Sequence, residues 1–76
     1  MKTQVIYWFQ GVEVIEMVDA KEVGTARARQ LWYWKTVDNG FSMTTEELAW
    51  LQATRKAWGY PDLYSVVEKI AYGREP

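Results

Sequence analysis

The sequence of 76 residues predicts one α+β domain, in which an N-terminal β-hairpin packs with three helices in the order ββααα. Two β-branched and aromatic runs flank Gln10-Gly11, which is typical of a hairpin. Helix-start patterns then precede three further segments, and no linker or repeat divides the chain. Residues 1–73 are expected to form the domain, followed by a flexible C-terminal tail at 74–76.

The two expected strands are apolar on both sides. Alternation places Val5, Tyr7 and Phe9 on one face of the first strand and Ile6 and Trp8 on the other. The second run, VEVIEMV, likewise separates poorly into a polar and an apolar side. Either helices cover both faces of this hairpin, or one face is left for a partner.

The first helix is expected at about residues 20–35. Asp19 and Glu22 have the spacing of a capping box that would begin it. Gly24 would then lie in mid-helix, at a cost of about 1 kcal/mol relative to Ala. Four residues that lie along one line at helical spacing predict a low ridge that lets this helix approach the sheet closely: Ala20, Gly24, Ala28 and Leu31.

The second half of the chain predicts a turn and two helices. Residues 37–40, VDNG, favour a turn, and residues 41–43 are a candidate third short strand. Thr44 or Thr45 should cap a helix that runs to Trp58 and stops at Gly59. Pro61 is expected in the first turn of the last helix, which presents Leu63, Val66, Val67 and Ile70 on its apolar face and ends at Gly73.

The composition argues against several kinds of chemistry. The chain contains no His, the commonest general base and metal ligand, and no Cys to serve as a nucleophile or thiolate ligand. Glu46 and Glu47 are adjacent and diverge on a helix, so they suit a helix N-terminus better than a catalytic pair. We therefore expect no enzymatic activity, no catalytic residues, no metal and no cofactor.

The absence of Cys also favours a reducing, cytoplasmic setting. The apolar run near the N-terminus is short and is followed by Glu13 and Glu16, so neither a signal peptide nor a membrane span is expected. Nine basic and ten acidic residues give a net charge of −1, which disfavours a nucleic acid as the main partner.

The segment LWYWK at residues 31–35 is the most unusual feature of the sequence. Successive helical residues point about 100° apart, so one packed face cannot hold Leu31, Trp32, Tyr33 and Trp34 together. Trp and Tyr are enriched at protein interfaces, although small domains also use them to enlarge a core. Both interpretations stay open. The candidate partner-binding residues are Tyr7, Trp8, Arg27, Arg29, Trp32 and Trp34.

These observations predict a small protein-binding module, either monomer or homodimer, whose partner is another protein or protein complex. A single short domain with many aromatics and neither Cys nor His is similar in type to small phage-encoded proteins that inhibit host machinery. RNA polymerase and defence nucleases are examples of such targets. This similarity rests on overall character and implies an inhibitor or modulator of a larger assembly.

The second half also carries a short motif. Phe41 and Met43 alternate before a Thr-Glu-Glu-Leu helix start, a Gly-Tyr junction follows, and a second apolar helix completes residues 40–73. This pattern resembles the ribbon-helix-helix family of repressors. The resemblance implies, as the alternative function, a DNA-binding dimer in which Phe41, Ser42 and Met43 lie in the strand that enters the major groove.

Overall fold

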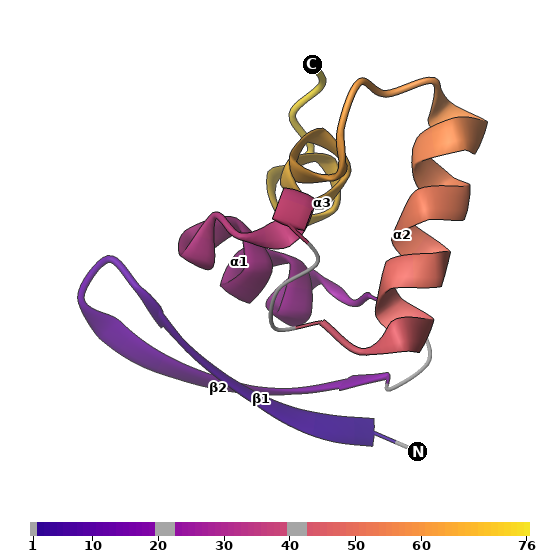
Figure 1. The fold of residues 1–76 in the computed structure, drawn as a ribbon. Coiled ribbons are helices and arrows are strands. Elements are labelled where there is room, and N and C mark those ends of the chain that lie inside the picture. The colour runs from indigo at the N-terminus through magenta and orange to yellow at the C-terminus, as the bar shows by residue number, and fades with distance from the viewer. Residues whose placement is uncertain (1, 20–22, 40–42) are drawn as a thin grey trace.

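The computed structural model describes residues 2–19, 23–39 and 43–76 (Figure 1). Two strands are followed by three α-helices, which confirms the predicted α+β order, and a short 3₁₀-helix, η1, lies between the first two α-helices. The elements are β1 (Lys2–Phe9), β2 (Val12–Asp19), α1 (Thr25–Trp34), η1 (Val37–Asn39), α2 (Thr45–Trp58) and α3 (Leu63–Tyr72).

The hairpin has the two-residue turn that the sequence indicated. β1 and β2 pair antiparallel, with Phe9 opposite Val12 on either side of the turn. Gln10 and Gly11 have φ angles of 53° and 78°, and two consecutive positive values are what a type I′ turn requires. This turn fixes the register, which sets Ile6 directly opposite Ile15.

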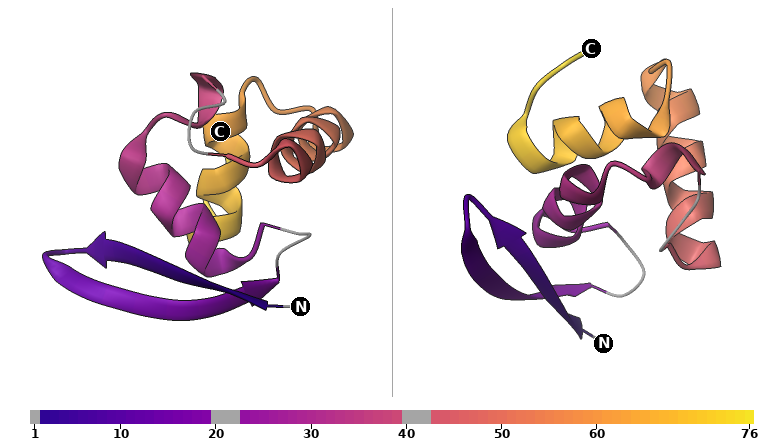
Figure 2. Two further views of the ribbon diagram at one scale, coloured as in Figure 1. Left: turned by 60° about the horizontal axis from the view of Figure 1, so that its bottom comes forward. Right: turned by 60° about the vertical axis from the view of Figure 1, so that its left-hand side comes forward.

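The elements form layers, with α1 in the middle. α1 lies across one face of the hairpin and packs against α3 on its other side, while α2 packs on α3 (Figure 2). Among the described residues, the two strands contact α1 and no other helix. The hairpin is therefore an outer layer, attached to the rest of the molecule through α1.

The main core lies between the helices. Its largest fully buried side chains come from α1, η1, α2 and α3: Leu31, Val37, Leu51, Val66 and Val67. The hairpin belongs to a separate small cluster, in which Val5 and the half-buried Val14 pack against Ala26 of α1. Most of the apolar burial is therefore helical.

The start of α1 differs from the prediction. The helix begins at Thr25, and Gly24 is its N-cap with an extended backbone, so the expected start near residue 20 with an Asp19–Glu22 capping box was wrong. β2 continues to Asp19, and the side chain of Val23 is buried before the helix begins. Gly24 thus avoids the cost of a mid-helix glycine. Ala28 and Leu31 of the predicted ridge are buried in the core, whereas residues 20–22 lie outside the described residues.

The start and end of α2 agree with the prediction. Thr44 Oγ1 accepts a hydrogen bond from Glu47 N at 3.1 Å, and Thr44 N donates one to Glu47 Oε1 at 2.9 Å, which completes a capping box. Gly59 ends the helix with a φ of 72°. The candidate strand at 41–43 falls mainly on residues 40–42, outside the described residues, and stays a prediction.

α3 begins two residues later than expected. Asp62 is its N-cap and accepts a hydrogen bond from Ser65 N at 2.7 Å, so Pro61 precedes the helix rather than opening its first turn. Asp38 of η1 adds a second carboxylate, which accepts a hydrogen bond from Leu63 N at 2.8 Å. These two carboxylates accept hydrogen bonds at the positive N-terminal end of α3, and they stabilise a helix that starts at Leu63 instead of Pro61.

The C-terminal residues follow α3 without regular structure. Arg74 forms an ion pair with Glu68 at 3.3 Å, and Glu75 forms one with Lys69 at 3.1 Å. These surface pairs are worth little individually, and the flexibility expected for 74–76 stays a prediction.

Candidate protein-interaction surface

One face of the hairpin leaves large apolar side chains in solvent. We call these four residues the outer face: Ile6 is 46% exposed, Trp8 52%, Ile15 54% and Met17 57%. The register brings them together, because Ile6 and Ile15 lie opposite each other. Trp8 follows Ile6 on the same face of β1, and Met17 follows Ile15 on the same face of β2. The opposite face of the hairpin carries Val5, which is buried against α1.

The edges of the outer face are polar. Lys2 and Gln4 are exposed in β1, and Glu13, which lies opposite Trp8, is exposed in β2. An apolar centre with a polar rim is the usual composition of a protein–protein contact surface. Contiguous exposed apolar groups of this kind are uncommon on soluble monomers and mark interaction sites.

The LWYWK segment is divided between the core and the surface. Leu31 is fully buried and Trp32 is half-buried. The Trp32 ring stacks on Tyr64 with 6.4 Å between centroids and meets the Tyr72 ring edge-on at 5.0 Å. Trp32 therefore belongs to the packing between α1 and α3.

The next two aromatics of the segment point elsewhere. Tyr33 and Trp34 are 50% and 43% exposed at the C-terminal end of α1. The 100° rotation between helical neighbours produces this division, as the sequence suggested. Tyr33 and Trp34 form a second apolar region of the surface.

Arg27 is held inside the molecule by an ion pair. Its Nε donates to Glu47 Oε2 at 2.6 Å and its Nη2 to Glu47 Oε1 at 3.0 Å, so the contact is bidentate. Arg27 Nη1 also donates to Gln30 Oε1, and Gln30 Nε2 donates to the carbonyl of Ile6 at 2.5 Å. This network ties β1, α1 and the N-terminus of α2 together, and it positions the hairpin.

The Glu47 side chain is only 9% exposed. Burial alone would raise the pKa of Glu47, but the hydrogen bonds and charge of Arg27, together with the Thr44 N–H, outweigh burial and lower the pKa below its usual value. Glu47 is thus ionised at neutral pH. Its carboxylate accepts hydrogen bonds from Arg27 and from the Thr44 N–H of the capping box. Glu47 therefore has a structural role.

The remaining arginine of the prediction, Arg29, lies beside α3. Its guanidinium carbon is 5.7 Å from the centre of the Tyr72 ring, and that of Arg74 is 4.8 Å from the same ring. Such cation–π contacts help to fix α1 and the C-terminal residues against α3. The partner-binding roles of Arg27, Arg29 and Trp32 stay predictions.

The structure adds three residues that the sequence did not single out as anchors: Ile6, Ile15 and Met17. The predicted anchor Trp8 lies with them on the outer face, and Trp34 is exposed at a second place. The side chain of Tyr7 lies outside what the structure describes. Strand alternation already grouped Ile6 with Trp8, but sequence could not tell which face α1 would cover.

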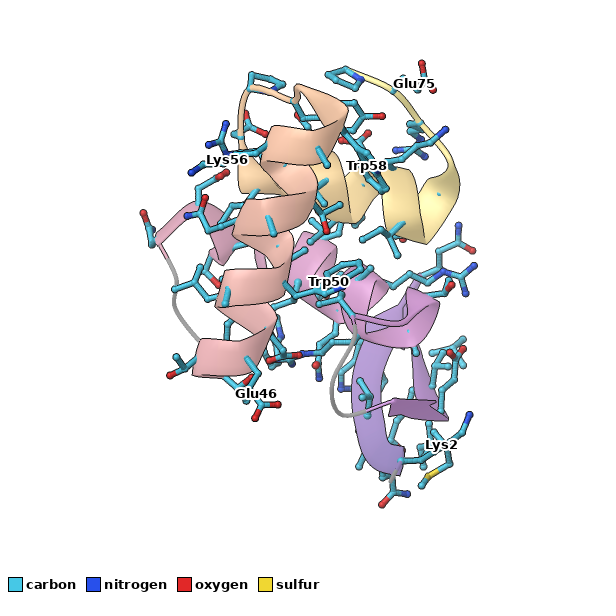
Figure 3. All side chains as sticks on the ribbon, turned by 90° about the vertical axis from the view of Figure 1, so that its right-hand side faces the viewer. Lys2, Glu46, Trp50, Lys56, Trp58 and Glu75 are labelled. Carbon is cyan, nitrogen blue, oxygen red and sulfur yellow. The ribbon has the colours of Figure 1, made fainter. Side chains whose placement is uncertain are left out.

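Another exposed aromatic lies far from the hairpin. Trp58 is 43% exposed and meets Tyr60 edge-on at 5.3 Å. These two rings, with Lys69 and Glu75, line a shallow open hollow. Figure 3 places Trp58 and Glu75 at the opposite end of the molecule from Lys2 of β1. Trp58 therefore offers a control position for experiments on the outer face.

Of the residues suggested for DNA binding, Phe41 and Ser42 lie outside the described residues. Met43 is half-buried and packs against the helical core. Within the described part of the chain no group of acidic residues could hold a metal ion, and no described helix has the length and apolarity to cross a bilayer.

No protein-family model, curated protein or solved structure matches this chain. The resemblance to ribbon-helix-helix repressors and the similarity in type to phage inhibitors therefore depend on the sequence features alone.

Proposed function

We propose that this chain is a non-enzymatic protein-binding module that docks through the outer face of its hairpin, with Tyr33 and Trp34 as a second contact region. One observation carries the proposal: the outer face leaves Ile6, Trp8 and Ile15 about half exposed, although the small helical core buries Leu and Val side chains completely. When a partner removes such side chains from water, the free energy of the system falls, and this favours binding.

The size of this gain is sufficient for a specific contact. Complete burial of a large aliphatic side chain contributes roughly 1.5–3 kcal/mol, and half-exposed side chains retain about half of that for a partner. A Trp at the centre of an interface typically contributes about 2 kcal/mol or more by truncation. The four outer-face residues together thus supply several kcal/mol toward the cost of association.

The chemistry of the face favours a protein over other partners. Its rim near the turn carries Glu13, and the whole chain has a net charge of −1, so a polyphosphate or an anionic membrane surface is electrostatically disfavoured. A module of this size that only binds acts by occupying a surface of its partner. The expected biological role is therefore inhibition or modulation of a larger assembly.

The test is an affinity capture that compares matched variants. The double variant Trp8→Thr/Ile15→Thr removes two large apolar groups from the outer face and keeps residues that suit a strand. Trp58→Gln removes an aromatic that is 43% exposed at the far end of the molecule. Proteins retained from a cell extract by each immobilised variant would be quantified by mass spectrometry, after circular dichroism has confirmed that each is folded.

We expect at least one protein that binds saturably to the wild type and to Trp58→Gln, and whose retention falls by about tenfold or more with the double variant. Equal retention by all three proteins would contradict docking through the outer face. Retention of nothing by the wild type, from an extract of the organism that encodes it, would also contradict the proposal.

A tight dimer would point to the alternative function. If light scattering gives twice the chain mass at nanomolar concentration, and duplex DNA is bound with a steep dependence on salt, the ribbon-helix-helix interpretation would replace ours. We expect a monomer that leaves duplex DNA unshifted at low salt.

A further inference from the structure

A continuous chain of hydrogen bonds runs from the N-terminus of α2 to the hairpin. Glu47 accepts from Arg27 Nε and Nη2 at 2.6 and 3.0 Å. Arg27 Nη1 donates to Gln30 Oε1, and Gln30 Nε2 donates to the Ile6 carbonyl at 2.5 Å. Arg27 and Gln30 are three residues apart in α1, a spacing that places them on the same side of a helix. Consecutive bonds thus join three elements that are distant in the sequence.

The chemistry of these groups fixes the order of donors and acceptors. A carboxylate and a backbone carbonyl only accept hydrogen bonds, whereas a guanidinium only donates them. Arg27 and the Ile6 carbonyl can therefore be bridged only by a group with an acceptor at one end and a donor at the other. The amide of Gln30 is such a group. Arg27 holds the oxygen of this amide and so directs its NH2 group toward β1.

The side chains of this chain are buried. Gln30 and Glu47 are each 7% exposed, and the Arg27 side chain is 14% exposed. Hydrogen bonds in such surroundings strengthen one another, and a buried polar group that loses its partner is costly. A change at one end therefore affects the next member, because water has little access to replace the lost bond.

The described path from α2 to the hairpin runs through α1. Among the described elements, the backbone of α2 lies close to that of α3 and to neither strand, while α1 lies close to both strands. The main core, which holds Leu51 of α2, includes no described residue of the hairpin. An effect of Glu47 on the hairpin is therefore expected to pass through Arg27 and Gln30.

We propose that Glu47, Arg27 and Gln30 form a relay that holds the hairpin on α1, so that loss of the Arg27–Glu47 contact loosens the hairpin while the helices stay folded. Without Glu47, Arg27 no longer fixes the amide orientation that directs Gln30 to Ile6. The two states of this device are the hairpin held on α1 and the hairpin loosened from it. The relay is independent of the proposed function, although it also positions the outer face, to which Ile6 belongs.

Amide hydrogen exchange measured by NMR follows the hairpin and the helical core separately. A two-residue turn closes on a hydrogen-bonded pair, and such pairs then alternate along the ladder. This alternation includes the amides of Val5 and Val14, which we call the ladder amides. The amides of Leu51 in α2 and Val67 in α3 are the core amides. Because a two-stranded hairpin is marginally stable on its own, the ladder amides exchange faster when the hairpin is loosened.

Two substitutions separate the relay from general stability. Glu47→Gln removes the charge that holds Arg27 but keeps a residue that suits this position of a capping box. We expect it to speed exchange at the ladder amides by about tenfold, which corresponds to the loss of roughly one hydrogen bond. Val66→Ala, at a fully buried site of α3 outside the relay, should speed exchange at the core amides but change the ladder amides by less than about twofold.

A double-variant cycle distinguishes a relay from independent effects. Gln30→Met removes both ends of the amide and keeps a long, unbranched side chain that suits a helix. It should speed exchange at the ladder amides by about tenfold. In Glu47→Gln/Gln30→Met we expect less than about a twofold further increase, because Glu47 then acts on a relay that is already broken. Independent effects would multiply to about a hundredfold.

Three results would overturn the relay. These are wild-type exchange at the ladder amides of Glu47→Gln, a ladder increase in Val66→Ala as large as that in Glu47→Gln, or a multiplied effect in the double variant. If Glu47→Gln does not fold, Arg27→Lys takes its place in the same cycle, because an ammonium cannot reproduce the fork that binds both Glu47 and Gln30. Ladder amides that exchange at the wild-type rate in Arg27→Lys and Gln30→Met would equally contradict the proposal.

Discussion

The helical part of the molecule and the hairpin use similar apolar residues in opposite ways. Leu31 and Leu51 are completely buried between helices, whereas Ile6 and Ile15 of the hairpin are about half exposed. The helices cover one another on several sides, but among the described elements the hairpin is covered by α1 alone, on one face. The location of a residue in the layers, and not its type, determines whether it stabilises the fold or is available for a partner.

The LWYWK segment shows the same contrast within one helix. Trp32 packs between Tyr64 and Tyr72, while Trp34, two residues later, lies at the surface. Stability should therefore depend on the first of these Trp residues and binding on the second.

The largest expected effect is in the helical core. Leu31→Ala creates a cavity at a fully buried site and should lower the free energy of unfolding by about 3–4 kcal/mol. Urea denaturation followed by circular dichroism measures this change. A loss below about 1 kcal/mol would show that the helical core is not the main source of stability.

The ion pair between α1 and α2 should come next. Glu47→Ala leaves the Arg27 guanidinium without its bidentate partner and removes the capping box, so we expect a loss of about 2–3 kcal/mol at pH 7. Glu46→Ala, the adjacent exposed position, is the control and should cost about 0.5 kcal/mol or less. Equal effects of the two substitutions would contradict the structural role of the Arg27–Glu47 pair.

The same pair predicts a dependence on pH. Because the folded protein lowers the pKa of Glu47 below its unfolded value of about 4.3, the contribution is fully present above that value and is lost as the pH falls through the folded pKa. The difference in unfolding free energy between wild type and Glu47→Ala should therefore be constant near neutrality and shrink below about pH 4. Denaturation curves at several pH values test this, and a constant difference down to pH 2 would exclude the mechanism.

A smaller difference is expected between the two Trp residues of LWYWK. Trp32→Ala should lower the free energy of unfolding by about 2 kcal/mol, because it removes the packing with Tyr64 and Tyr72. Trp34→Ala should cost less than about 1 kcal/mol and instead weaken partner binding. If Trp34→Ala unfolds the protein, the surface assignment of this residue is wrong.

The smallest effect is expected on the outer face. Ile15→Thr keeps a β-branched side chain at an exposed position and should change the free energy of unfolding by less than about 0.5 kcal/mol. Thermal unfolding of this variant beside Leu31→Ala gives the contrast directly. A loss comparable to that of Leu31→Ala would mean that Ile15 is part of the core.

Local patterns gave most of the fold. Gln10-Gly11, Gly59 and Gly73 acted as predicted, and Thr44 is the cap among the two threonines proposed, since turns and caps depend on residues a few positions apart. The first and last helices started later than predicted. In α1 the strand extended to Asp19 and Gly24 became the cap, and in α3 the Asp38 carboxylate reached the helix end from 25 residues away.

The candidate site was less accessible to sequence reasoning. Alternation grouped Ile6 with Trp8, and the excess of aromatics indicated an exposed surface, but both hairpin faces looked equally apolar. The Arg27–Glu47 contact joins residues 20 positions apart and left no pattern in the sequence. Arg27 was expected at the partner surface because it lies close to LWYWK in the sequence; that role stays a prediction, and the structure shows its guanidinium in the contact between α1 and α2.

The sequence by itself determined the order of elements, the hairpin turn, the caps of α2, and the division of LWYWK around a helix. All of these follow from local backbone preferences and from the periods of helices and strands. Only the tertiary structure decided that α1 covers the Val5 face, that Gln30 binds the Ile6 carbonyl at the β1 edge, and that no described helix covers the outer face. These outcomes depend on contacts between distant segments, which compete for the same apolar surface and leave no trace in any short stretch of sequence.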